Sequence, residues 1–310
     1  MENSGRPLSN PDVIARTTAL ARGISESRLR HPTVQHPMRG LHSPSSSSTE
    51  WDMAAAWARH RPGITVNSLT AARYWGFRLP LNLQVPELIH LNRSPTSGQI
   101  RRTGIIATQH TYLPEEVREV EPGVTVTSPV RTLYEIMAHL PDRPLIAAAD
   151  GLVNHHDRGY DVLDRRLATL PELHAYPRLR RGARGIRRFG RLMQRVRVGS
   201  DSVPETILRL ACEDHGIDDL VLGHAVYDDD GRLLFQSDLA HLPSRTSIQY
   251  EGKHHSSPEQ MRRDIERTRR TLSAGWKEVR VSSTDLQQHV VWNKTWMPRA
   301  VALIAEAITR

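Results

Sequence analysis

Four polar residues in the last third of the chain have the types and the spacing of a metal site. Asp238 lies in LLFQSDLAH, and Gln249, Glu251 and Lys253 follow at steps of two in SIQYEGKHH. Residues two apart in a strand point to the same face, about 6.6 Å from each other, so this row shares one face. An acid facing the row from a neighbouring strand would gather several oxygen ligands, which is what Mg²⁺ requires.

The surrounding sequence predicts the elements that must hold these residues. An apolar periodicity over Val203–Asp214 predicts a helix that ends at Gly216. The acids Asp228, Asp229 and Asp230 with the glycine after them have the composition of a hairpin turn rather than of a ligand set. The predicted strands are 221–227, 232–240, 247–251 and 276–281; a helix opened by Ser257 and Pro258 precedes the last strand, and a long helix from about Leu286 closes the chain.

Motifs for other chemistries are missing from the sequence. It contains no GxxxxGK[ST] phosphate loop, no strand-linked GxGxxG, no HExxH and no GxSxG. Nucleotide-binding, dinucleotide-binding, zincin and hydrolase-elbow functions therefore lack their motifs. His155 and His156 stand where a helix is expected to end, and a structural role is favoured for them over a metal role.

Turn-forming and low-complexity stretches of the sequence predict three domains, 1–45, 46–198 and 199–310. The first combines a short helical pattern, a helix capped by Ser25 and a strand in MRGLH, which together suggest a small winged helix-turn-helix. A serine-rich tract, SPSSSST, separates it from a mixed α/β segment. That segment is predicted to hold helices over 51–59 and 68–75, strands over 88–91, 104–107 and 124–127, and a helix entered through Ser128 and Pro129. The fold class expected is α/β, or α+β overall.

Composition limits the class of protein. Hydrophobic residues make up 38% and charged residues 25%, which suits folded domains and argues against wholesale disorder. No apolar stretch approaches the roughly 20 residues that cross a bilayer. The N-terminal residues lack the features of a secretion signal, and Cys212 is the only cysteine, so a cytoplasmic protein without disulfides is expected.

A run of arginines suggests contact with phosphates. The net charge is +8, but 39 of the 42 basic residues are arginine, a bias that GC-rich coding alone could produce. Clustering is more informative, and residues 178–197 hold nine arginines and no acid. A solvated helix and linker and a nucleic-acid contact are both open for this run. The candidate contacts are Arg180, Arg181, Arg184, Arg187, Arg188 and Arg191, with Arg267 on the later helix.

The α-β-β-β-α-β order, with an acid on the second strand and a polar row on the third, resembles the PD-(D/E)XK restriction-endonuclease-like fold. More narrowly, the region is similar to the Vsr-like nuclease domain that follows an AbiEi-type antitoxin or regulator domain in many bacterial proteins. The matching stretches are SVPETILRL, LLFQSDLAH, IQYEGKHH, RRDIERTRRTL and GWKEVRVSSTDL. A looser match in front covers GISESRLRH, MRGLH, NSLTAARYWGF and VTVTSPVRTL.

The resemblance assigns roles to individual residues. It makes Asp238 the central metal ligand, with Gln249 where glutamate is commonest and Glu251 where lysine or aspartate is usual. Gln249 removes one negative charge and Glu251 would restore it. Lys253 would replace the lysine that orients the attacking water if the chain stays extended past Gly252.

Two further residues complete the implied site. His255, which ends the motif, could contact phosphate or act as an acid. Glu205 would assist from the helix, although Ser202-Val-Pro-Glu205 is also a capping box, and the two roles are compatible.

Two functions follow from the resemblance. The first is a DNA endonuclease dependent on Mg²⁺ or Mn²⁺, acting in repair or phage defence. The second is a non-catalytic DNA-binding regulator or antitoxin with a degenerate nuclease fold, since a fold does not establish a function. DNA is the expected partner in both, and a toxin or defence partner and the oligomeric state are left open. A third possibility, an interaction module that binds no nucleic acid, remains because the arginine richness could be compositional.

Overall fold

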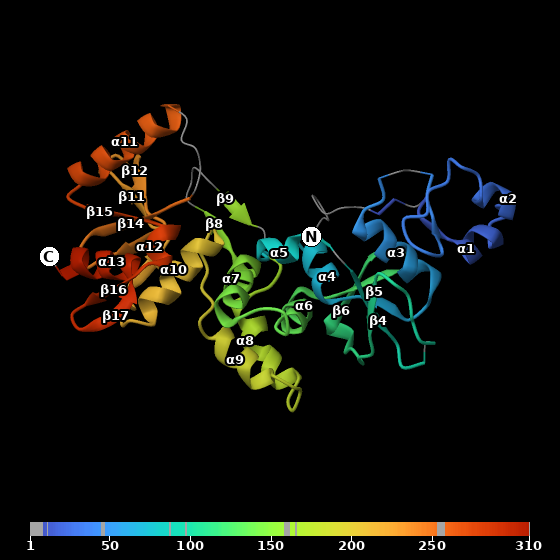
Figure 1. Ribbon diagram of the computed structural model, residues 1–310. Coiled ribbons are helices and arrows are strands. Elements are labelled where there is room, and N and C mark those ends of the chain that lie inside the picture. Colours follow the sequence, from blue (N-terminus) through green and yellow to red (C-terminus); the bar gives the residue numbers. More distant parts are fainter. Residues whose placement is uncertain are drawn as a thin grey trace. The chain divides into compact units, whose positions relative to one another are not determined.

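The computed structural model describes residues 9–10, 12–44, 47–86, 88–96, 98–157, 162–164, 166–252 and 258–309. The chain is mixed α/β and divides into two compact units. The first unit comprises Met1–Pro141 and Pro171–Gly190, and the second comprises Asp142–Leu170 and Arg191–Arg310. Figure 1 shows both units, with many of their helices and strands labelled. In the part of the chain that is described, no helix is long and apolar enough to cross a membrane.

The start of the first unit is a small arrangement of short elements. These are β1 (Ile14–Ala15), α1 (Arg16–Ala21), α2 (Glu26–Leu29) and β2 (Leu41–His42). β1 and β2 pair in antiparallel fashion. As predicted, Ser25 caps α2, and its hydroxyl accepts a hydrogen bond from the Arg28 backbone N–H at 3.2 Å.

A five-stranded mixed sheet forms the centre of the first unit, in the order β5-β4-β3-β7-β6. Its strands are β3 (Ile64–Val66), β4 (Ile89–Arg93), β5 (Ile105–Thr108), β6 (Val117–Glu121) and β7 (Val124–Thr127). Its helices are α3 (Glu50–His60), α4 (Ser68–Tyr74), α5 (Leu81–Gln84), η1 (Pro114–Glu116), α6 (Pro129–Ile136), α8 (Leu170–Leu179) and the start of α9 (Ile186–Met193). The predicted helices over 51–59 and 68–75 and the strand over 124–127 are confirmed, as is the entry to α6 through Ser128 and Pro129.

The second unit is built on a four-stranded sheet, in the order β10-β13-β14-β15. Its strands are β10 (Leu220–Leu222), β13 (Leu239–His241), β14 (Thr246–Glu251) and β15 (Lys277–Ser282). β14 and β15 run parallel and are connected through α11 (Pro258–Ser273), whose predicted cap Ser257 lies outside the described residues. The remaining elements are α7 (Asp142–Val153), β8 (His155–Asp157), β9 (Val162–Asp164), α10 (Val203–Glu213), β11 (Ala225–Tyr227), β12 (Leu233–Gln236), α12 (Ser283–Gln287), β16 (His289–Trp292), β17 (Thr295–Pro298) and α13 (Arg299–Thr309).

The apolar core of the second unit lies between its sheet and helices α10 and α13. Leu208, Leu239, Ile248, Val281 and Ile304 are buried together there, each at most 1% exposed. Helix α11 covers the opposite face of the sheet, where it contacts β15 (Figure 1). The two faces of β14 therefore meet different surroundings, the core on one side and α11 on the other.

Helix α7 joins the second unit through a buried ion pair. Asp150 accepts hydrogen bonds at Oδ2 from the Arg209 guanidinium of α10 at 3.0 Å and from the Thr206 hydroxyl at 2.7 Å. The Arg197 backbone N–H bonds its other oxygen at 2.9 Å. Such a pair is costly to break because either partner alone would leave a buried charge. α7 lies inside the segment predicted as the middle domain, yet it packs against the C-terminal elements.

One prediction about the end of the chain is wrong. The expected long helix from about Leu286 is interrupted by the β16–β17 hairpin, whose turn residues Asn293 and Lys294 have φ of 45° and 65°. Two successive positive φ values are typical of a type I′ turn, which directs a hairpin. The helix end expected near His155 and His156 is confirmed, because α7 ends at Val153 and the two histidines begin β8 directly after it.

The two long strands expected over 221–227 and 232–240 are each broken in the middle. Their outer halves form the separate β11–β12 ribbon, and their inner halves β10 and β13 belong to the main sheet. The break lies at Gly223, whose φ is 58° and whose N–H bonds the Asp238 carbonyl at 2.9 Å. Asp228, Asp229 and Asp230 lie at the tip of the ribbon, as predicted, and Asp228 bonds the backbone N–H of Arg232 at 2.7 Å.

Candidate functional site

The predicted polar row lies on the α11 side of β14. Ile248 and Tyr250 pack into the core, so the alternation of the strand directs Gln249 and Glu251 to the other face. This is the arrangement that the spacing predicts. Lys253 and His255 lie outside the described residues.

Asp238 occupies the break between β12 and β13, one residue before β13 begins. Its Oδ2 accepts a hydrogen bond from the Tyr250 backbone N–H of the neighbouring strand at 2.7 Å. Burial raises the pKa of the Asp238 carboxyl, and the carboxylates of Glu251 and Asp201 raise this pKa further. The Tyr250 N–H and the Arg267 guanidinium oppose the rise. Asp238 is thus a half-buried acid with two other acids nearby.

Glu205 lies in the first turn of α10 and both caps the helix and faces Asp238. Its backbone N–H donates to the Ser202 hydroxyl at 3.3 Å, and its Oε2 accepts from the Asp201 backbone N–H at 2.8 Å. Burial raises the pKa of Glu205 to about 7, with a further rise from the Asp238 charge. The cap predicted for this helix is present in altered form, because the Glu205 carboxylate bonds the N–H of Asp201 rather than that of Ser202. The assisting role of Glu205 stays a prediction.

Gln249 and Glu251 are both engaged within the protein. The Gln249 side chain is buried, and its Nε2 donates to the Gln236 carbonyl at 2.7 Å. Its amide oxygen is therefore the group it can offer to a ligand. The Glu251 carboxylate is 42% exposed and pairs through Oε1 with Arg280 at 3.0 Å and Arg267 at 3.7 Å.

The donor set suits a hard cation in its chemistry. Asp238, Glu251 and the Gln249 amide carry oxygen ligands, the type that Mg²⁺ and Mn²⁺ prefer, and Glu205 lies near Asp238. Burial is the main cause of the raised Glu205 pKa, and a cation beside Asp238 and Glu205 would offset the smaller part that comes from the Asp238 charge. Over the described residues, however, no three His, Cys, Asp or Glu side chains converge at metal-binding spacing. Glu251 in particular is held by arginines.

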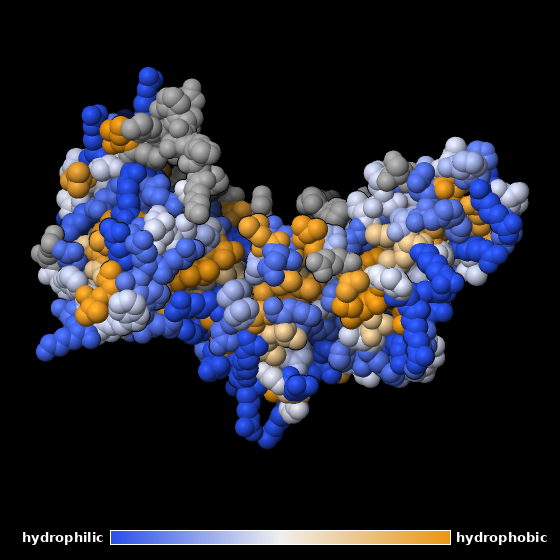
Figure 2. All heavy atoms as spheres, viewed as in Figure 1, coloured by the Kyte–Doolittle hydropathy of each residue, from blue (hydrophilic) through white to orange (hydrophobic). Residues whose placement is uncertain are grey.

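The predicted phosphate-binding arginines divide into internal and exposed groups. Arg180 binds Glu116 and the Thr111 carbonyl, and Arg188 donates to the carbonyls of Met137 and Leu140 at 2.9 Å each. These two side chains hold the first unit together. Arg191 pairs with Asp142 at 3.4 Å. Figure 2 shows a hydrophilic surface over the turn between α8 and α9, and the exposed arginines of this region are Arg181, Arg184 and Arg187.

The arginine run is not a solvated linker. Ile186 and Phe189 of α9 are buried, and the Phe189 ring packs edge-on against Tyr134 and Tyr176. The run therefore combines an apolar packing face with an exposed basic one, as an amphipathic helix does.

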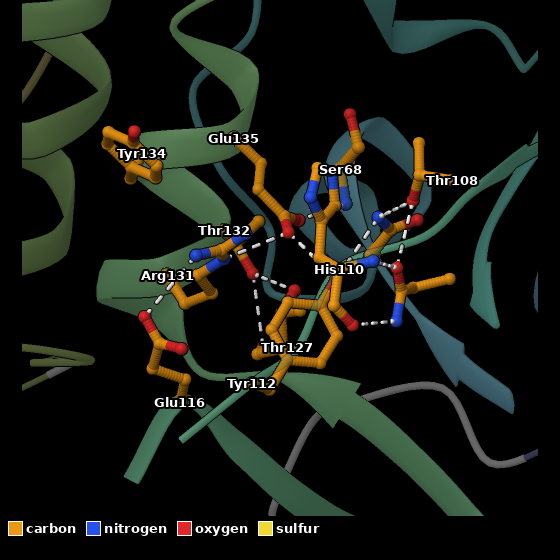
Figure 3. Close-up of polar contacts among 12 residues, drawn as sticks. Ser68, Thr108, His110, Tyr112, Glu116, Thr127, Arg131, Thr132, Tyr134 and Glu135 are labelled. Carbon is orange, nitrogen blue, oxygen red and sulfur yellow. Dashed lines mark hydrogen bonds and ion pairs between the residues drawn. The ribbon is translucent and has the colours of Figure 1, made fainter. Parts of the chain in front are cut away.

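Sequence reasoning missed a buried polar network in the first unit, drawn in Figure 3. Arg131 of α6 donates to Glu135 at 2.9 Å and pairs with Glu116 at 3.4 Å, and its guanidinium lies 4.8 Å from the Tyr112 ring centre. Glu135 also accepts hydrogen bonds from the Tyr112 hydroxyl at 2.8 Å and the Ser68 N–H at 2.9 Å. The network therefore fixes the start of α4 and the loop that contains Tyr112 to α6.

A period-two signal marks one polar face of the sheet in this unit, but it does not reach Arg131, Glu135 or Glu116. Polar residues alternate with apolar ones in three strands, so that Thr65, Asn92 and Thr125 are cross-strand neighbours on one face. The same alternation marks a second missed residue, Arg280, in KEVRVS of β15. Both signals show which residues share a face, but neither names the partners across it.

No protein-family model, curated protein or solved structure matches this chain.

Proposed function

We propose that the second unit is a divalent-metal-dependent endonuclease that hydrolyses phosphodiester bonds in DNA, with the arrangement of a restriction-endonuclease-like domain. One observation carries the proposal. The Asp238 carboxylate interacts with those of Glu205 and Asp201, at the start of α10, and with that of Glu251, at the end of β14, so acids from two other segments of the chain gather near it. Neighbouring acids that raise one another's pKa are typical of functional sites.

Each residue of the site has its own role in the proposed reaction. Asp238, Glu251 and the Gln249 amide oxygen would hold Mg²⁺ or Mn²⁺, and the ion would supply Lewis acidity and lower the pKa of a bound water. Glu205, whose carboxylate is held by the Asp201 N–H and lies near Asp238, would assist from α10. The roles of Lys253 and His255 in orienting water and contacting phosphate stay predictions.

A second candidate function is a DNA-binding regulator or antitoxin without catalysis. The observation in its favour is that the Glu251 carboxylate already forms ion pairs with Arg280 and Arg267. The amide nitrogen of Gln249 likewise donates its hydrogen bond to a backbone carbonyl. In this case the N-terminal helices would bind an operator, with α2 near Arg28 and Arg30 in the major groove. Helix α2 has four residues, which is short for that role.

Nicking of a supercoiled plasmid in Mg²⁺ or Mn²⁺ separates the two functions. The wild-type protein should nick, Asp238→Asn should not, and Asp230→Asn, an exposed acid in the ribbon turn, should nick as the wild type does. Loss of nicking in both variants, or in neither, would contradict the assigned site. A wild-type protein that never nicks but binds an operator, more weakly as salt rises, would favour the regulator.

A further inference from the structure

Two arginines beside the candidate site converge on one oxygen atom. Arg280 Nη1 lies 3.0 Å and Arg267 Nη2 lies 3.7 Å from Oε1 of Glu251. Arg280 comes from β15 and Arg267 from α11, so two different elements aim guanidinium groups at the same point. Oε1 of Glu251 therefore marks a position where the protein stabilises an anion.

The sheet register places this position next to the candidate metal ligands. In the parallel pairing of β14 with β15, Arg280 is the partner of Gln249, and Glu251 follows two residues later on the same face. The Arg267 guanidinium is also near enough to Asp238 to lower that carboxyl's pKa. The two arginines and the proposed metal ligands thus share one side of the sheet.

The Arg280 guanidinium contacts Glu251 through Nη1, while its other nitrogens are held by neighbouring residues. Its Nε donates to Glu278 at 2.6 Å and its Nη2 to the Thr268 hydroxyl at 2.7 Å. Glu278 is buried and is itself bonded by Thr268 at 2.9 Å. These contacts hold the planar group in place before any ligand arrives, an arrangement that favours recognition of an oxyanion.

The contact with Glu251, by contrast, is open to exchange. The Glu251 side chain is 42% exposed and that of Arg280 is 34% exposed. Ion pairs with this much exposure contribute little to stability because solvent screens them. An incoming anion that satisfies the same two guanidinium groups can replace the carboxylate at small cost.

We propose that Arg280 and Arg267 bind a phosphodiester group of the nucleic acid, at the position that Glu251 Oε1 occupies in the free protein. The proposal deepens the endonuclease function, because it names a substrate contact next to Asp238. The backbone phosphate takes over the two arginines, and Glu251 is released to serve as an oxygen ligand beside Asp238. In the free protein, the Glu251 carboxylate thus occupies the position that the phosphate takes when DNA binds.

Binding of a short DNA duplex in EDTA tests this inference without cleavage. Arg280→Gln and Arg267→Gln should each weaken binding by roughly tenfold near 0.1 M salt and lower the slope of log K against log salt by about one. Arg269→Gln, an exposed arginine of the same helix, is the matched control and should leave both quantities unchanged. Arg280→Lys should bind with intermediate affinity because it keeps the charge and loses the planar fork.

Glu251→Gln supplies a result of opposite sign. Removing the competing carboxylate should tighten DNA binding in EDTA several-fold, whereas the same variant should fail to nick plasmid in Mg²⁺. A purely structural ion pair predicts no gain in affinity. Thermal melting of each variant shows whether the fold is kept.

The outcomes separate this inference from the proposed enzyme. If Arg280→Gln, Glu251→Gln and the wild type bind DNA alike, the phosphate site is refuted even when the wild type nicks. If the predicted binding changes occur and the wild type never nicks, the endonuclease is refuted and the phosphate site stands.

Discussion

Replacing Arg131 by methionine should destabilise the first unit by about 3–5 kcal/mol, the range for breaking a buried ion pair from one side. The structure sets this magnitude. The side chains of Glu116 and Glu135, which flank Arg131, are 1% and 7% exposed, so their charges cannot turn to solvent when the guanidinium is lost. Glu116 keeps Arg180 and the Tyr176 hydroxyl, which places the greater loss at Glu135.

A double variant separates lost charge from lost packing. Arg131→Met with Glu135→Gln removes both members of one pair, and a matched apolar and neutral replacement should recover part of the stability. Amide hydrogen exchange in α4 and α6 reports the loss, because the network fixes both helices. Arg16→Met, which removes an exposed pair with Glu26, is the control and should cost no more than about 1 kcal/mol. An Arg131→Met loss as small as that of the control, or strict additivity in the double variant, would refute the reasoning.

Two more predictions concern buried groups. Burial, helped by His139 and Arg73, lowers the pKa of His90 to about 4 from an ordinary 6.5, so the unfolded chain binds a proton first as pH falls. The neutral His90 therefore lets the protein keep its full free energy of unfolding above about pH 6.5. As the pH falls toward 4, this free energy decreases by roughly 3 kcal/mol, because each unit of pKa shift corresponds to about 1.36 kcal/mol. Urea titrations of wild type and His90→Gln across that window measure it, and equal acid sensitivity would disprove it. Burial also raises the pKa of the Cys212 thiol to about 12, so a disulfide reagent should label it only as fast as the second unit opens; labelling within seconds in native buffer would contradict its place in the core.

The fold could be predicted from sequence where the signals are local. Val124–Thr127 followed by Ser128 and Pro129 combines a strand alternation with a cap and a proline at the first helical turn, and the structure has both elements. The β16–β17 hairpin was missed because its turn residues, Asn293 and Lys294, lie between segments apolar enough to suit a helix. Periodicity alone does not separate such short apolar runs.

The candidate site shows the same division. That Gln249 and Glu251 share a face follows from the period of a strand, and the sequence predicts it. Asp238 stands in a break of the strand because of Gly223, which lies fifteen residues earlier. Arg280 reaches Glu251 because β14 and β15 pair in parallel although a whole helix separates them in the chain. Contacts of that kind are set by tertiary packing, and a single sequence carries no local signal for them.

Titration of Mn²⁺ into the full-length protein bound to a short DNA duplex, followed by calorimetry, tests the central claim most directly. The account predicts that the wild type and Asp230→Asn bind the ion alike and that Asp238→Asn binds it at least tenfold more weakly. Undiminished binding by Asp238→Asn, or no binding by the wild type, would contradict a metal site built on Asp238.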